Sequence, residues 1–143
     1  MKHVVVGLDG SDGSRAALRW AAAEAQQWGV PLVAVWAWEF SPLIVATDVP
    51  IELEQLQASV SERLHAVLLE ELGATRVEEV DARPTEDAPV RALIEAARED
   101  DLLVVGSRGY GGFKGALLGS VSQQVVHYAV CPVTVVRATA EHR

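Results

Sequence analysis

"DLLVVGSRGYGGFKGALLGS", residues 101–120, joins a short apolar run to a loop in which glycine recurs. The run 101–106 has the length and the valine and leucine content of a strand buried in a sheet. Residues 106–120 hold six of the chain's 11 glycines and also Lys114, the only lysine beyond Lys2. Because glycine lets a backbone approach a ligand closely, we expect this loop to place its N–H groups against a bound molecule.

Similar apolar runs alternate with segments of helical periodicity along the chain. In 53–67, the clearest such segment, apolar residues recur every three or four positions. We predict strands at 3–9, 31–38, 76–82, 101–106 and 132–136, helices at 13–28, 48–73, 90–97 and 119–130, and a loop at 83–89. Right-handed crossovers place helices on either side of parallel strands. The order therefore predicts an α/β fold, a Rossmann-like, doubly wound parallel sheet of five strands.

Length and charge limit the class of protein. A chain of 143 residues is expected to form a single domain, residues 1–143, with a core of its own. The net charge of −8 argues against binding nucleic acid, and the apolar runs are too short to cross a membrane. Cys131 has no second cysteine with which to form a disulfide. We expect it to be a buried apolar residue in a cytoplasmic protein.

The ligand site is predicted at the carboxyl ends of the strands, where open α/β sheets bind their ligands. Both the glycine loop and the turn "GLDGS", residues 7–11, leave the sheet at that edge. The helix that begins near Gly119 and Ser120 adds the free N–H groups of its first turn, so a phosphate is the expected ligand group. The loop is not a P-loop, because Lys114 is followed by Gly115 and not by serine or threonine.

The glycine spacing in this loop is specific. Gly106, two residues, Gly109, nine further residues, and then Gly119 and Ser120 form a pattern that resembles the nucleotide-binding signature of the universal stress protein family. The resemblance extends, in the same order along the chain, to "VVVGLDGS", "LLVVGSRG", "LLGSVSQQVV" and "CPVTVVR". It implies the strand order 3-2-1-4-5 and ATP as the bound cofactor, with Mg²⁺ held by the phosphates and not by side chains.

The same resemblance implies roles for individual residues. Asp9 would contact the ribose, with Gly7 beside it, and Ala37 would present backbone groups to adenine. The glycines after the fourth strand would approach the ribose and phosphates, and the start of the last helix would bind the phosphate chain. The implied nucleotide-binding residues are Gly7, Asp9, Ala37, Gly106, Arg108, Gly109, Gly112, Gly119, Ser120 and Val121, with Lys114 as a further contact. The chain departs from the family at "EDAP", residues 86–89, where a Gly-x-Pro is common. The resemblance therefore does not predict which residues form the adenine side of the pocket.

Several of these residues could instead have a purely structural role. Asp9 is also suited to capping the first helix or bracing the turn before it, and Ser120 is a candidate N-cap whatever the ligand. Arg108 and Lys114 are as well suited to a solvated loop as to phosphate binding. The chain's 4 tryptophans, at positions 20, 28, 36 and 38, are expected to pack in the core and not to form a binding platform.

Two functional classes fit these features, and the intact set of glycines argues against a third, an interaction scaffold with an empty pocket. The first, which the resemblance implies, is a regulatory module of the stress response that binds ATP and acts by sensing nucleotide or through an unidentified protein partner. The second is an enzyme on the same fold, such as a slow Mg²⁺-dependent ATPase or an adenylyl-transferring relative. The sequence around the loop offers an enzyme no evident general base or acid pair, so we predict no catalytic residue and no metal-binding side chain.

The last strand is expected to mediate a homodimer. As the final strand of the sheet, 132–136 would leave one row of N–H and C=O groups unpaired beside the apolar residues Val133, Val135 and Val136. Antiparallel pairing of this strand with its copy about a two-fold axis would satisfy both edges, and the resemblance implies the same contact. The alternatives are a tail, 139–143, that folds back over the edge, and a monomer that its charge keeps soluble.

Overall fold

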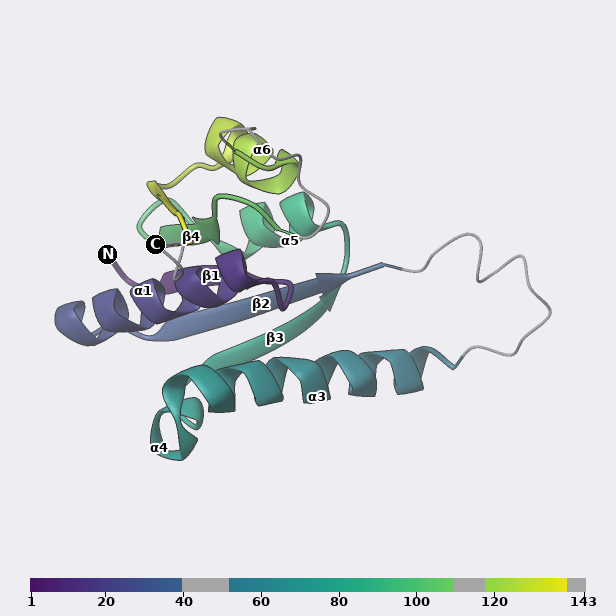
Figure 1. Cartoon of the computed structure of the whole chain (residues 1–143). Coiled ribbons are helices and arrows are strands. Elements are labelled where there is room, and N and C mark those ends of the chain that lie inside the picture. The colour runs from purple at the N-terminus through teal and green to yellow at the C-terminus, as the bar shows by residue number, and fades with distance from the viewer. Residues whose placement is uncertain (40–51, 110–117, 139–143) are drawn as a thin grey trace.

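Five strands form one sheet in the order β3-β2-β1-β4-β5 in the computed structural model of the chain (Figure 1). The structure describes residues 1–39, 52–109 and 118–138. The strands are β1 (Val4–Leu8), β2 (Leu32–Trp38), β3 (Asp81–Glu86), β4 (Leu102–Gly106) and β5 (Val133–Val136). Every pair of neighbours is parallel, so the predicted doubly wound sheet and its strand order are confirmed.

The connecting helices cover both faces of this sheet (Figure 1). In the described part of the chain they are α1 (Asp12–Trp28), α3 (Leu53–Leu72), the single turn α4 (Ala74–Val77), α5 (Pro89–Ala96) and α6 (Ser120–Tyr128). Helices α1 and α3 pack on one face, and α5 and α6 pack on the other. With the exception of α4, these are helices that the apolar periodicity predicts.

Local sequence signals set the ends of α1. Ser11 is the N-cap, and its side-chain oxygen accepts a hydrogen bond from the backbone N–H of Ser14 at 3.2 Å. Gly29 ends the helix with a φ of 65°, a left-handed conformation that glycine adopts without steric cost. Because the cap follows β1 so closely, α1 begins at the carboxyl edge of the sheet.

Alternation along the strands divides the core into two layers. In β1, Val4 and Val6 point toward α1 and α3, while Val5 points toward α5 and α6. All three valines are fully buried. Leu18 of α1 and Leu64 of α3 pack in the first layer. Burial on both faces explains why the central strands have continuous apolar sequences.

The third strand lies later in the chain than the sequence predicts. The predicted strand 76–82 is wrong, because its first residues form α4 and β3 covers Asp81–Glu86, much of the expected loop. β3 pairs only with β2 and is therefore an edge strand. The Asp87 N–H donates to the Trp38 carbonyl at 3.0 Å, and alternation then turns the nitrogen of Pro84 to the outer edge. No hydrogen-bond donor is needed there, so an edge strand tolerates the proline.

The long helix α3 ends where the sequence predicts. Gly73 at its C-cap has a φ of 86°, which favours glycine. The predicted start of this helix, at 48–50, lies outside the described residues, and the described helix begins at Leu53.

The tryptophans divide between the core and the surface. Trp20 and Trp36 pack against the core as predicted. Trp28 is 61% exposed, so the prediction that it packs in the core is wrong. Its indole N–H donates to the Glu24 carboxylate, one turn back in α1, at 3.1 Å. This polar partner lies on the solvent side of the helix and holds the ring at the surface.

Cys131 is half-buried beside the layer formed by α5 and α6. Burial raises the pKa of its thiol, so the sulfur stays protonated at neutral pH. The residue therefore has the apolar character predicted for it, although it is not fully buried.

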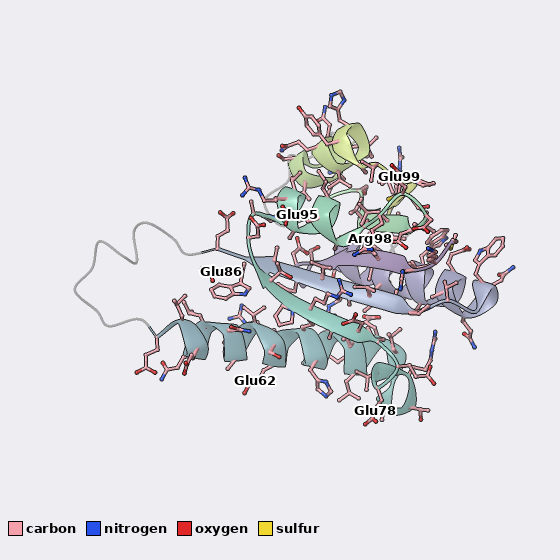
Figure 2. The ribbon with its side chains drawn as sticks, turned by 180° about the vertical axis from the view of Figure 1, so that it is seen from behind. Glu62, Glu78, Glu86, Glu95, Arg98 and Glu99 are labelled. Carbon is pink, nitrogen blue, oxygen red and sulfur yellow. The ribbon has the colours of Figure 1, made fainter. Side chains whose placement is uncertain are left out.

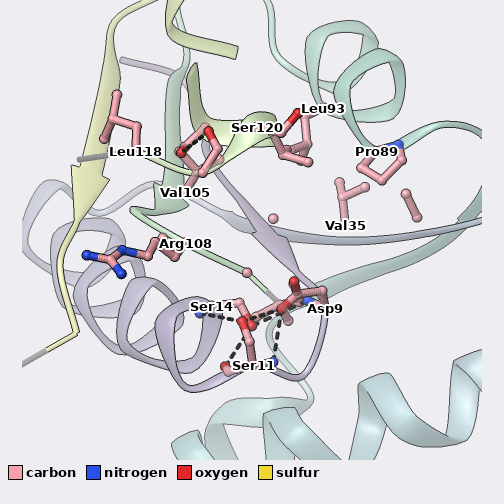
Figure 3. A pocket seen from close by; sticks show the side chains of 18 residues that line it. Asp9, Ser11, Ser14, Val35, Pro89, Leu93, Val105, Arg108, Leu118 and Ser120 are labelled. Atoms are coloured by element: carbon pink, nitrogen blue, oxygen red, sulfur yellow. Dashed lines mark hydrogen bonds between the residues drawn. The ribbon is translucent and has the colours of Figure 1, made fainter. Parts of the chain in front are cut away.

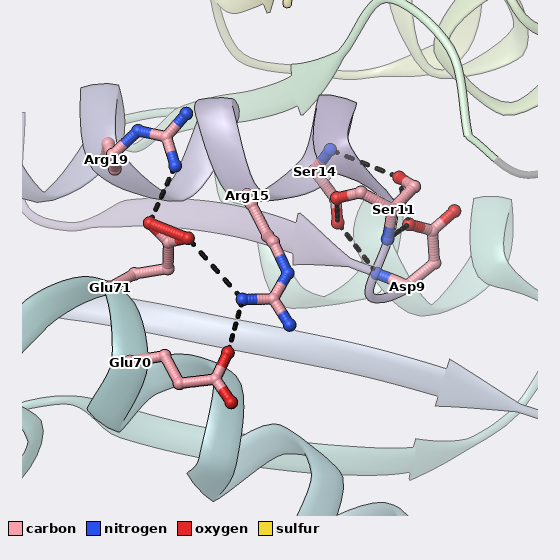
Figure 4. Close-up of polar contacts among 7 residues, drawn as sticks. All are labelled: Asp9, Ser11, Ser14, Arg15, Arg19, Glu70 and Glu71. Atoms are coloured by element: carbon pink, nitrogen blue, oxygen red, sulfur yellow. Dashed lines mark hydrogen bonds and ion pairs between the residues drawn. The ribbon is translucent and has the colours of Figure 1, made fainter.

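Most charged side chains lie at the surface, and in the described segments Asp101 is the buried exception. The acidic residues labelled in Figure 2, such as Glu62 of α3, extend into solvent. Between α1 and α3, Arg15 pairs with Glu70 at 2.7 Å and Arg19 pairs with Glu71 at 2.6 Å (Figure 4). These ion pairs join the two helices of one layer. None of the helices in the described segments is long and apolar enough to span a membrane.

Candidate functional site

A cavity of about 280 Å³ opens at the carboxyl ends of β1, β2 and β4 (Figure 3). The strand order reverses at this point, because β2 lies on one side of β1 and β4 lies on the other. The predicted residues that line the cavity are Gly7, Asp9, Ala37, Gly106, Arg108, Gly109, Gly119, Ser120 and Val121. Gly112 and Lys114 lie outside the described residues. The fold thus brings together residues that are far apart in the sequence.

Three polar residues hold the turn after β1 (Figure 3). The Asp9 Oδ1 atom accepts the backbone N–H of Ser11 at 2.9 Å and also accepts the Ser11 hydroxyl. The Asp9 N–H donates to the Ser14 hydroxyl oxygen at 3.3 Å, and that hydroxyl donates to the Ser11 carbonyl at 3.0 Å. Asp9 therefore braces the turn, whereas Ser11, and not Asp9, caps α1.

Gly109 lies against the Asp9 carboxylate. A Cβ atom at position 109 would meet the Asp9 Oδ2 atom at less than a normal contact distance. The left-handed glycines of the described segments are at other positions, so space and not backbone conformation excludes a side chain here. No donor in the described part of the chain contacts Oδ2. This oxygen is therefore available to a ligand in the cavity.

Gly106 has a packing role in the same region. A Cβ atom at this position would lie 2.7 Å from the carbonyl carbon and oxygen of Gly13, in the first turn of α1. A Cβ atom on Gly13 would in turn meet the carbonyl oxygen of Arg108. Backbone thus packs on backbone where α1 meets the loop after β4. The sequence alone does not reveal this contact of Gly13, and its one signal is a residue of low helix propensity in the first turn of a helix.

Replacing Gly106 by alanine is expected to lower the free energy of unfolding by roughly 1–3 kcal/mol, because two backbone segments would have to separate. The matched control is Gly7→Ala. Its Cβ atom would lie 2.9 Å from Leu93 Cδ1, the end of a flexible side chain that can move aside. Urea denaturation of both variants without ligand measures the difference, and equal stability of the two variants would contradict this account of the packing.

The start of α6 forms a second wall of the cavity. The Gly119 N–H donates to the Ser107 carbonyl at 2.6 Å, and the buried Ser122 hydroxyl donates to the same oxygen at 3.0 Å. Gly119 is the N-cap and Ser120 is already helical, so the prediction of Ser120 as N-cap is wrong. The N–H groups of Ser120 and Val121 find no acceptor in the described segments, as expected for the first turn of a helix. Both residues line the cavity.

A third wall is apolar. Val35 of β2, Val105 of β4, and Pro89 and Leu93 of α5 form it (Figure 3). Pro89 lies in the segment 86–89, where the chain departs from the family pattern, and it is the first residue of α5. This wall is not among the features predicted from the sequence, although apolar residues near the carboxyl ends of two strands are a usable signal. Such a surface can hold a flat apolar group.

The charged groups that line the described cavity are Asp9 and Arg108. In the three described segments, no group of three or more histidine, cysteine or acidic side chains is placed so that it could hold a metal ion. The remaining groups are chiefly backbone N–H donors, hydroxyls and apolar side chains. This set is suited to holding a polar ligand that has a flat apolar part.

Proteins similar to this chain are universal stress proteins. The model of the universal stress protein family matches residues 1–137. A universal stress protein of Mycobacterium tuberculosis strain H37Rv is 37% identical over 136 residues, which cover 94% of this chain and 45% of that protein. The chain thus spans about half the length of the curated relatives it matches.

Solved structures of the same family share the fold. A universal stress protein in complex with cAMP is 33% identical, with a TM-score of 0.61 over 96% of this chain and 98% of that chain. A universal stress protein from Archaeoglobus fulgidus in complex with dAMP is 23% identical, with a TM-score of 0.64 over 94% and 97% of the two chains. The similarity to the dAMP complex shows the fold alone, whereas the higher identity to the cAMP complex also supports membership of the same family.

Proposed function

This chain belongs to the universal stress protein family, and we propose that it is a regulatory module that binds an adenine nucleotide, ATP, at the carboxyl edge of its sheet. One observation carries the proposal: a carboxylate, a glycine-containing loop and the start of a helix meet around one cavity. The 33% identical universal stress protein in complex with cAMP supports an adenine nucleotide as the class of ligand.

The adenosine part would lie between the Asp9 carboxylate and the apolar wall. Asp9 Oδ2 has space beside Gly109 to accept a hydrogen bond from a ribose hydroxyl. Gly7 lets the backbone of β1 approach the sugar. The adenine ring would pack against Val35 and its neighbours in the apolar wall, and the backbone of Ala37 would lie at the edge of the ring.

The phosphates would lie between the loop after β4 and the start of α6. The free N–H groups of Ser120 and Val121 and the helix dipole both favour an anion there. Gly106, Gly109 and Gly119 would bring their backbones close to the phosphates, and Arg108 would add positive charge. We assign Gly112, which lies outside the described residues, to the same part of the site. Mg²⁺ that accompanies ATP would be held by the phosphates.

We assign the module to the cytoplasm and to a stress response, in which it would act by sensing the nucleotide or through an unidentified protein partner. The residues that line the site favour binding of the nucleotide over its hydrolysis. Asp9 is the one carboxylate in the described lining, and one of its two oxygens is already held by Ser11. A general base needs a free acceptor aimed at the attacking water, and in this proposal the other oxygen of Asp9 binds the ribose and not a water at the phosphates.

Calorimetry followed by a phosphate-release assay tests this function. The chain is expected to bind ATP more tightly than inorganic triphosphate and to release no phosphate above background over several hours. Tight binding with steady phosphate release would replace the regulatory module by a slow ATPase. Failure to bind any adenine nucleotide would contradict the proposal itself.

We also propose a homodimer that pairs through β5. The Leu103 N–H donates to the Pro132 carbonyl and the Ser107 N–H donates to the Val136 carbonyl, so alternation turns Val135 outward. Among the described residues, the outer edge of β5 therefore has N–H and C=O groups without a partner strand, beside apolar side chains, which suits it to strand pairing. The other edge of the sheet, β3, carries Pro84 and charged side chains that oppose such pairing. The tail 139–143, which could cover β5 instead, lies outside the described residues.

Replacing Val135 by proline is expected to convert the dimer into a monomer, because it removes an outward N–H donor without removing a donor to β4. Val135→Thr keeps the N–H and the β-branched shape, so it serves as the control and should remain dimeric. Sedimentation at micromolar concentration gives the mass of each variant. A wild-type mass equal to that of one chain would rule out the dimer, and a dimeric Val135→Pro variant would place its interface elsewhere.

A further inference from the structure

We infer that Ser11 is a positioning residue that aims the Asp9 carboxylate and thereby lets this chain distinguish ribonucleotides from deoxyribonucleotides. The inference rests on the proposed function, because it concerns the ribose end of the same site. It assigns to Ser11 a second role in addition to capping α1.

The contacts of Ser11 fix one carboxylate oxygen of Asp9. Oδ1 accepts both the backbone N–H and the hydroxyl of Ser11 (Figure 4). The Ser11 hydroxyl oxygen also accepts the Ser14 N–H at 3.2 Å. The hydroxyl thus donates its proton to Asp9 and uses a lone pair for the helix cap. Because Ser11 is buried, water does not readily replace these contacts.

With Oδ1 occupied, the other oxygen is left for the ligand. Asp9 and Gly109 both line the cavity, and the absence of a side chain at position 109 leaves room beside Oδ2. A carboxylate held through one oxygen cannot turn freely to find another partner. Asp9 is exposed in the chain without ligand, so a bound nucleotide would have to cover Oδ2. A nucleotide that lacks the matching hydroxyl would then leave this oxygen without a partner, and sites built to bind a hydroxyl reject such analogues strongly.

Three variants separate the two roles of Ser11. Ser11→Ala loses both the proton for Asp9 and the cap for Ser14, although its backbone N–H remains. Ser11→Thr keeps the hydroxyl and therefore both roles. Ser11→Asp keeps an acceptor for the Ser14 N–H but has no proton to donate, and it places a second negative charge beside Asp9.

The test is the ratio of dissociation constants for deoxy-ATP and ATP, measured by calorimetry with both 2′-deoxy-ATP and 3′-deoxy-ATP. The wild-type chain and Ser11→Thr are expected to prefer ATP over one of the two analogues by about tenfold or more. In Ser11→Ala and Ser11→Asp this preference should fall toward one. Thermal melting of each variant verifies that it is folded and shows the loss of the cap separately.

The outcomes are distinguishable. If Ser11→Ala binds ATP more weakly but keeps the wild-type ratio, Ser11 is a helix cap only and the inference is overturned. A wild-type chain that binds ATP without preferring it to either deoxy analogue would also overturn it, while the proposed function would stand. A wild-type chain that binds none of the three nucleotides would overturn the proposed function and this inference with it.

Discussion

Gly109→Val is expected to lower ATP affinity by roughly 100-fold or more while the chain stays folded. A Cβ atom at this position would collide with Asp9 Oδ2, and Ser11 holds that carboxylate in place. The new side chain would therefore either displace the carboxylate or push the loop away from the phosphates. Both changes remove contacts to the nucleotide. Calorimetry measures the affinity, and circular dichroism during heating measures the fold.

Gly29→Ala is the matched control for this variant. Gly29 has a φ of 65° and open space around its Cα atom, so alanine there costs backbone strain of about 1–2 kcal/mol but does not touch the cavity. The control should melt at a lower temperature and bind ATP normally, whereas Gly109→Val should show the opposite pattern. Undiminished ATP affinity in Gly109→Val would remove the loop after β4 from the site.

Asp9→Ala is expected to weaken ATP binding by about tenfold to a hundredfold, because a hydrogen bond to a charged acceptor contributes about 1–3 kcal/mol. The affinity for inorganic triphosphate, which has no ribose, should change little. Asp9→Asn is a useful comparison, since it keeps an oxygen that can accept from Ser11 and so preserves the turn. Titration of the three proteins with both ligands measures the effect. Normal ATP binding by Asp9→Ala would leave Asp9 with its turn-bracing role alone.

Much of the fold is predictable from the sequence because burial on both faces leaves a strong pattern. β1, β2 and β4 are continuous apolar runs, and their carboxyl ends lie where the glycine loop and the turn at Asp9 are predicted to meet. β3 is not predictable in the same way. It is an edge strand with exposed charges and Pro84. In the sequence, where its pairing with β2 cannot be seen, such residues are typical of a loop.

The finer structure of the site depends on contacts between distant segments. Gly106 and Gly13 need glycine because two backbones meet, and neither position reveals its partner in the sequence. Ser11 has the sequence signal of a helix cap, and its contact with the Asp9 carboxylate becomes visible only in three dimensions. The apolar wall is hidden for the same reason, since Val35 and Leu93 are also ordinary core residues in the sequence.

Backbone amide NMR during a titration with ATP locates the nucleotide site directly. For a site at the carboxyl edge of the sheet, the signals of Asp9, Gly109, Gly119 and Ser120 are expected to shift together and to saturate with one nucleotide per chain. The signals of Val30 and Leu72, beside a second cavity at the amino edge of the sheet, should stay in place. Shifts that gather at the amino edge, or no shifts at all at saturating ATP, would contradict a nucleotide site at the carboxyl ends of β1 and β4.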